Sequence, residues 1–169
     1  YSGIFSLYSI LRLTTNQRAA FITSLLLGGY PWFLRAAGWD YPDGAGIAHL
    51  LLLLLLLTIA TQNPAWKMWF FIAGFIHASL LVTNPFWVGF FPSWAVYFIL
   101  LNRSQGKLSA KEIILGAGYF IAGNLCLVLI TGWFYQQVTG NFFFLERSLN
   151  TSVALTHGYR DYNNAGVAI

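Results

Sequence analysis

The stretch "YPDGAGIAHLLLLLLLLT", Tyr41 to Thr58, contains eight consecutive leucines, Leu50 to Leu57. A helix made of such a run is stable in lipid or in a deep protein core. Three ionisable residues lie at its start: Asp40, Asp43 and His49. Ionisable groups at the start of an apolar helix are candidates for function, because hydrocarbon does not tolerate them without a partner. We call this end of the helix, with Asp40, Asp43 and His49, the mouth.

The composition around this stretch is that of an integral membrane protein. The 169 residues are 57% hydrophobic and 8% charged, with a mean hydropathy of +0.62, whereas a soluble domain carries about 25% charged residues. Seven Trp, nine Tyr and fifteen Phe favour the same class, because aromatic residues gather at membrane interfaces. The basic residues are scattered over several loops, so we expect membrane lipid as the surroundings and no nucleic-acid partner.

We expect an all-α, polytopic helical bundle with about five full transmembrane helices and one partial helix. The partial helix is Tyr1 to Leu11. At about 1.5 Å per residue it reaches half-way across a hydrocarbon core about 30 Å thick. The fourth full span contains Gly89 and Pro92 and is predicted to be broken or tilted. The five full spans are predicted at residues 19–37, 44–61, 66–83, 86–101 and 112–135.

The charges predict an orientation. Basic residues are enriched in cytoplasmic loops, and six of the nine fall on one side of the predicted spans. These six are Arg12, Arg18, Lys67, Arg103, Lys107 and Lys111. The other side receives Arg35, Arg147 and Arg160, with most of the acidic residues. We therefore predict a transmembrane domain at residues 1–140 and an interfacial or extramembrane tail at 141–169. The tail and the Asp40/Asp43 mouth would face the periplasm, the lumen or the exterior.

The mouth is the first candidate site. Asp43 follows Pro42 in the first turn of the predicted helix, where the helix dipole favours an anion. Carboxylates beside an imidazole can bind a divalent cation or hold a proton. Asp43 and His49 are therefore candidate ligands of a divalent cation, the one cofactor that the sequence suggests, although their spacing matches no recognised metal signature. The pattern alone favours the other interpretation, in which Asp40 and Asp43 form a polar helix cap and His49 is an interfacial anchor.

Two further features lie inside the predicted spans. His77 has small neighbours, Ala78 and Ser79, which favour a hydrogen bond between helices over a ligand role. The last span contains three glycines that predict close helix packing. These are Gly116, Gly118 and Gly123.

Three segments resemble polytopic glycosyltransferases of the GT-C superfamily, of the protein-mannosyltransferase and aminoarabinose-transferase type. The first is "NQRAAFITSLLLGGYPWFLRAAGWDYPDGAGIAHLLLLLLLL", in which Pro31, Tyr41 and Asp43 match the family pattern. The second is "FIAGFIHASLLVTNPFWVGFFPSWAVYFILL", which is similar to a glycine-containing span followed at once by a short span with a proline. The third is "WFYQQVTGNFFFL", where the family's chain leaves the membrane. The likeness covers most of residues 10–147, the middle portion of such an enzyme.

The resemblance implies transfer of a sugar from a polyprenyl phosphate at the non-cytoplasmic face. It makes Asp43 the second acidic residue of the catalytic site, with Asp40 beside it. The family's leading carboxylate lies in a first outer loop, before the part matched here, so the chain by itself is expected to transfer no sugar. The alternative function is a non-catalytic accessory or structural subunit of a larger bioenergetic or photosynthetic membrane complex, with other membrane subunits as partners.

Overall fold

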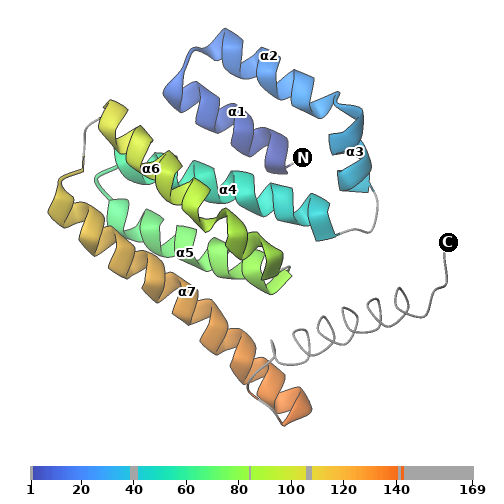
Figure 1. Ribbon diagram of the computed structural model, residues 1–169, viewed down its shortest axis with the longest axis vertical. Helices are drawn as coiled ribbons and strands as arrows, with labels where there is room; N and C mark the ends of the chain where they lie inside the picture. Colours follow the sequence, from blue (N-terminus) through green and yellow to red (C-terminus); the bar gives the residue numbers. More distant parts are fainter. Residues whose placement is uncertain (1, 39–41, 84, 106–107, 141, 143–169) are drawn as a thin grey trace, which may run out of the picture. The chain divides into compact units, whose positions relative to one another are not determined.

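The computed structural model of the chain describes residues 2–38, 42–83, 85–105, 108–140 and 142. Within these residues the chain is helical and forms no strand, which confirms the all-α expectation. The elements, drawn in Figure 1, are α1 (Ser2–Thr14), α2 (Gln17–Gly28), α3 (Pro31–Gly38), α4 (Pro42–Gln62), α5 (Trp66–Thr83), the 3-10 helix η1 (Pro85–Phe90), α6 (Phe91–Gln105) and α7 (Ala110–Thr139).

Two of the predicted spans are interrupted. The span at 19–37 is divided between α2 and α3, because Gly29 ends α2 with an N–H bond to the Leu25 carbonyl and Pro31 begins the next helix. Proline disfavours helical geometry in the residue before it, so the chain cannot continue straight through Tyr30. The span at 86–101 is also broken, since η1 gives way to α6 at Phe91.

α4 is the central helix of the first part of the chain. It contacts α1 on one side and α5 on another (Figure 1), and it also contacts α3 and α6. Leu55, Leu56 and Leu57 are all buried, although they follow one another around the helix. Burial on several sides explains why this helix is apolar all round instead of along one stripe.

The core lies between α4, α5 and α6. Leu53 of α4 and Leu80 of α5 are fully buried, and Trp94 of α6 is 5% exposed. The rings of Phe70 and Phe98 meet edge to face at 5.3 Å, a favoured aromatic geometry. This core holds the starts and ends of the helices in a defined register.

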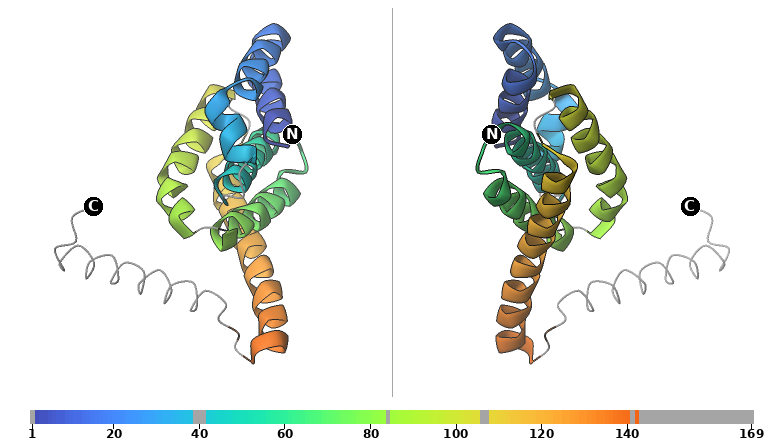
Figure 2. Two further views of the ribbon diagram at one scale, coloured as in Figure 1. Left: turned by 90° about the vertical axis from the view of Figure 1, so that its right-hand side faces the viewer. Right: turned by 90° about the vertical axis from the view of Figure 1, so that its left-hand side faces the viewer.

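Gln62, the last residue of α4, joins three helix ends. Its Nε2 donates to the Leu13 carbonyl near the end of α1, at 3.3 Å, and to Oε1 of Gln105 at the end of α6, at 2.7 Å. α1 and α2 lie side by side (Figures 1 and 2) and are joined by a short turn next to this point. The α1–α2 turn and the ends of α4 and α6 are therefore on the same side of the bundle.

α7 begins with a capping box. The Glu112 carboxylate accepts from the Ser109 backbone N–H, and the Glu112 N–H donates to the Ser109 hydroxyl, which satisfies free donors at the helix start.

The chain divides into two compact units, Tyr1–Leu127 and Val128–Ile169. In the second unit, Gly140 adopts a φ of 75°, which favours glycine. The tail predicted at 141–169 lies almost wholly outside the described residues, so its boundary stays a prediction.

Among the residues that the structure describes, two helices are long and apolar enough to cross a membrane. They are the part of α4 from Gly44 to Gln62 and the whole of α7, while the apolar stretch of α5, Trp66–Val82, is shorter. Large apolar side chains are exposed along α7, among them Ile114 and Ile121, as expected for a surface in contact with lipid. Length and composition thus indicate an integral membrane protein, and the count of five full spans stays a prediction.

Candidate functional site

The start of α4 and the end of α5 meet at one end of the core. α4 and α5 are antiparallel neighbours joined by the short turn 63–65. His49 precedes Pro64 by 15 residues and Ser79 follows it by 15, so the two face each other across the hairpin. The Ser79 hydroxyl lies 3.3 Å from Nε2 of His49.

The hydrogen bonds of His49 define its tautomer. Nδ1 lies 2.7 Å from the Ala45 carbonyl, and a carbonyl can only accept, so Nδ1 carries the proton. In the neutral ring Nε2 is then an acceptor, and the Ser79 hydroxyl donates to it. A neutral imidazole arranged in this way can bind a cation through Nε2 once the Ser79 hydroxyl turns away.

Trp87 of η1 packs on the first turns of α4. A Cβ at Gly46 would lie 2.5 Å from Nε1 of Trp87, so only glycine lets the indole approach this closely. The Trp87 Nε1–H is buried and has no hydrogen-bond partner among the described residues. A buried donor without a partner is costly, which makes this N–H a candidate contact for a ligand oxygen.

The structure describes the side chains of only some of the predicted site residues. Asp40 lies outside the described residues. Asp43 belongs to α4 by its backbone, but its side chain is not described. It precedes His49 by six residues, or about 9 Å along the helix. His49 lies on α4 and contacts Ala45 and Ser79, and its role in a site stays a prediction. The grouping of the two aspartates with His49 stays a prediction, as does a metal site: within the described part of the chain, no three His, Cys, Asp or Glu residues form a metal-binding group.

Sequence reasoning did not assign Ser79 or Trp87 to this mouth. Ser79 was expected only as a small residue near His77, two positions before it in the sequence. In the structure its hydroxyl contacts His49. The equal spacing of His49 and Ser79 about Pro64 was a usable signal, because residues at equal distances from a tight turn face each other in a helical hairpin. No comparable signal identified Trp87, which reaches α4 only through the turn after α5.

A second polar group lies deeper, between α5 and α7. His77 is 6% exposed, and its Nδ1 lies 2.7 Å from Oδ1 of Asn124. This confirms the predicted hydrogen bond between helices. The Asn124 amide also donates to the Phe120 carbonyl. The imidazole is surrounded by rings, with the Trp94 centroid at 4.8 Å and the Phe120 centroid at 5.2 Å, so the group is built into the packing.

Another buried pair joins α4 to α6. The Thr58 hydroxyl is fully buried and lies 2.7 Å from the Tyr97 hydroxyl. Thr58 also donates to the Leu54 carbonyl, so in this pair the Tyr97 hydroxyl donates to Thr58. Hydrogen bonds of this kind hold helices together where lipid offers no partner. We regard both buried pairs as structural, and the mouth at the start of α4 as the candidate site.

Comparison with known protein families identifies the family of the chain. Residues 2–134 match the family described as dolichyl-phosphate-mannose-protein mannosyltransferase. No curated protein and no solved structure gave a match. The matched region extends from α1 through most of α7 and contains the whole described mouth. The chain therefore belongs to the dolichyl-phosphate-mannose-protein mannosyltransferase family, a family of membrane glycosyltransferases of the GT-C type.

Proposed function

We propose that the chain forms the central membrane part of a glycosyltransferase that transfers a sugar from a polyprenyl-phosphate donor at the non-cytoplasmic face. Family membership supports the reaction class. Two observations at the start of α4 support the location: the His49–Ser79 pair, and the unpartnered Trp87 N–H, which lies against Gly46, three residues before His49. In this proposal the Trp87 indole turns away from Gly46, and its N–H then donates to a phosphate oxygen of the donor lipid.

Asp43 and Asp40 supply the negative charge of the proposed site. A divalent cation would be held by the Asp43 and Asp40 carboxylates, because hard cations prefer oxygen ligands. His49 would contribute Nε2 after the Ser79 hydroxyl rotates. When bound, the cation would neutralise charge on the leaving phosphate. The residues of this chain orient the donor phosphate and keep the imidazole in one tautomer.

The orientation of the site follows from the basic residues. Arg12 and Arg18 flank the turn between α1 and α2, and Arg103 precedes the end of α6. The Gln62 hydrogen bonds bring these ends together, and the start of α4 is at the other end of the same helix. Because basic residues favour the cytoplasm, the mouth would be non-cytoplasmic.

A cysteine at Ser104, with Cys126 replaced by serine, should be labelled only after the membrane is permeabilised. Labelling from outside intact cells would reverse this orientation.

The decisive experiment is Asp43→Asn in the full protein, with sugar transfer from the polyprenyl phosphate as the readout. Asp43 lies in the first turn of α4, where its charge stabilises the helix by only about 0.3–1 kcal/mol, so folding and insertion should be retained. Loss of a group that takes part in the reaction should lower turnover about 100-fold or more. Trp87→Phe, which removes only the N–H donor from an aromatic ring, should raise the KM for the donor lipid.

The control is Glu112→Gln. Glu112 is also an acidic residue in the first turn of an apolar helix, but it lies near the opposite side of the membrane in the proposed orientation. Its substitution should leave transfer unchanged. Full activity of Asp43→Asn would show that Asp43 is only a cap. An inactive natural protein that co-purifies with other membrane subunits in fixed stoichiometry would favour the non-catalytic alternative.

A further inference from the structure

An open apolar groove runs along the α1–α2 hairpin. Its volume is about 820 Å³, and its walls include Phe5 and Tyr8 of α1 and Phe21, Ser24 and Leu25 of α2. Phe5, Phe21 and Leu25 are each at least 60% exposed. A groove this apolar requires an apolar occupant, because its walls would otherwise lose dispersion contacts along their length.

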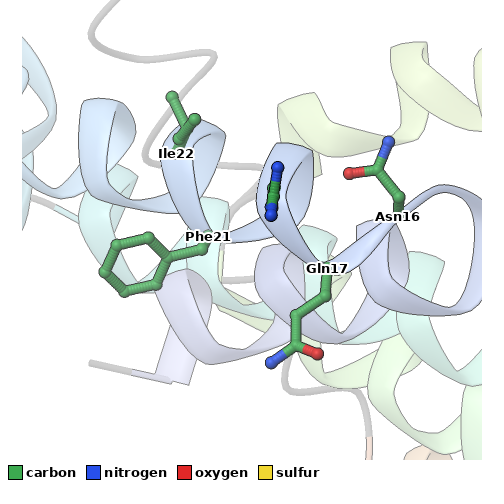
Figure 3. A pocket seen from close by; sticks show the side chains of 5 residues that line it. Asn16, Gln17, Phe21 and Ile22 are labelled. Carbon is green, nitrogen blue, oxygen red and sulfur yellow. The ribbon is translucent and has the colours of Figure 1, made fainter.

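A second pocket, with three polar residues in its wall, lies at the turn of the hairpin. It measures about 710 Å³ and is lined by Asn16, Gln17, Arg18, Phe21 and Ile22. Figure 3 shows the polar Asn16 and Gln17 at the start of α2 and the apolar Phe21 and Ile22 further along it. Phe21 lines both the pocket and the groove. The two cavities therefore form one site that is polar at one end and apolar along the rest.

The polar end is cationic. Arg18 is exposed and makes no hydrogen bond or ion pair with any residue that the structure describes. The Asn16 side chain is occupied, because it accepts from the Ala19 N–H at 2.8 Å. Across the turn, Arg12 donates to the Tyr8 hydroxyl at 3.1 Å, which holds a second guanidinium beside the groove. An anion would complement this end, and a guanidinium binds phosphate oxygens in a fork of two donors.

The length of the groove matches one leaflet of a bilayer. From Arg18 to Gly28 is ten residues, or about 15 Å of helix, and half of a hydrocarbon core is also about 15 Å. Ser24 lies within this length. It is 5% exposed, lines the groove, and its hydroxyl has no hydrogen-bond partner among the described residues. A glycerolipid carries ester carbonyls that can accept from such a hydroxyl.

We propose that the α1–α2 hairpin binds one anionic phospholipid of the surrounding membrane. The phosphate lies on Arg18 and Gln17, and an acyl chain follows Phe21 and Leu25 along α1. This site does not depend on the proposed glycosyltransferase function. The hairpin turn lies near the end of α4, as the Gln62 bond to Leu13 shows, whereas the mouth at His49 lies toward the start of α4. The bound lipid is therefore structural and is not the sugar donor.

The test uses the full chain purified in a neutral detergent and titrated with phosphatidylglycerol or phosphatidylcholine. Native mass spectrometry counts the lipids that remain bound. We expect one phosphatidylglycerol to be retained with higher affinity than phosphatidylcholine. Arg18→Gln should weaken phosphatidylglycerol binding about fivefold, which corresponds to about 1 kcal/mol for one basic residue near the membrane surface. Arg18→Lys should restore part of the affinity.

Two further variants separate the parts of the site. Phe21→Ala, which shortens the wall shared by pocket and groove, should weaken binding of both lipids. Arg103→Gln is the matched control, because Arg103 is an exposed basic residue near the same side of the bundle and lines neither cavity. It should leave phosphatidylglycerol binding unchanged. A thermal unfolding curve without added lipid checks that each variant is folded.

Several outcomes would overturn the proposal. Equal retention of phosphatidylcholine would show that the cationic end does not select the lipid. Equal losses in Arg18→Gln and Arg103→Gln would indicate general surface charge instead of a site. Competition by inorganic phosphate as strong as that by the lipid would leave only an anion site. A stable dimer that binds no lipid would assign the groove to a second copy of the chain.

Discussion

The crossing of α5 and α7 provides the sharpest test of the packing. The two backbones touch at a pair of glycines. A Cβ on Gly123 would overlap the Phe71 carbonyl of α5, and a Cβ on Gly74 would overlap the Phe120 carbonyl of α7. The obstructing atoms are backbone atoms, which cannot rotate away as a side chain can. Gly123→Ala should therefore push the two helices apart.

The size of the effect follows from these contacts. At Gly123 the new Cβ would also lie 2.9 Å from the Phe75 nitrogen, whereas ordinary contact begins at 3.4 Å. The helices must separate by about half an ångström there and by more at the Phe71 carbonyl. Overpacking of this kind costs about 1–3 kcal/mol. The higher helix propensity of alanine offsets about 0.5–1 kcal/mol of this cost, so the net loss of stability should be about 0–2.5 kcal/mol.

The assay is reversible unfolding of the purified protein in mixed micelles, followed by circular dichroism as the denaturing detergent is increased. Gly118→Ala is the matched control, because Gly118 lies on the same helix and a Cβ there would meet nothing within 4 Å. The control should be as stable as the natural protein or slightly more stable. Equal stability of Gly123→Ala and Gly118→Ala would refute the close crossing of α5 and α7.

The same unfolding assay tests the two buried pairs. His77→Leu and Asn124→Leu should each lower the free energy of unfolding. The double variant should lose less than the sum of the two single losses, with a coupling energy of about 0.6 kcal/mol. Strictly additive losses would mean that the two side chains do not interact. Tyr97→Phe should cost about 0.6 kcal/mol by removing the donor to Thr58. The matched variant Tyr119→Phe, on an exposed ring, should change nothing measurable. A larger loss for Tyr119→Phe than for Tyr97→Phe would contradict the assignment.

Local sequence was sufficient for most helix boundaries. The span predicted at 66–83 is α5 residue for residue, and the leucine-rich span differs from α4 by no more than two residues at either end. These boundaries depend on where an apolar run stops at Pro, Gly or polar residues, which is a local property. The missed break at Tyr30 also had a local signal, Gly29 before Pro31, but the long apolar run around it outweighed that signal.

The predicted site could be recovered only in part. The sequence identified His49 as a polar residue at the mouth, because an ionisable residue stands out in an apolar run. It did not identify Trp87, whose contact with Gly46 depends on the path of the chain through η1. The three glycines predicted to pack closely also differ in the structure: Gly116 and Gly123 meet α5, while Gly118 meets nothing.

By itself the sequence determined that this protein is helical and belongs in a membrane, and it proposed a candidate site beside the start of the leucine-rich helix. Tertiary structure alone decided which side chains meet across the helices. α4, α5 and α7 are apolar all round, so no periodicity shows which face of one helix turns toward another. The partners of His49 and His77 were set instead by the tight turn at Pro64 and by the glycine crossing at Gly74 and Gly123, because each fixes the register in which two helices can approach.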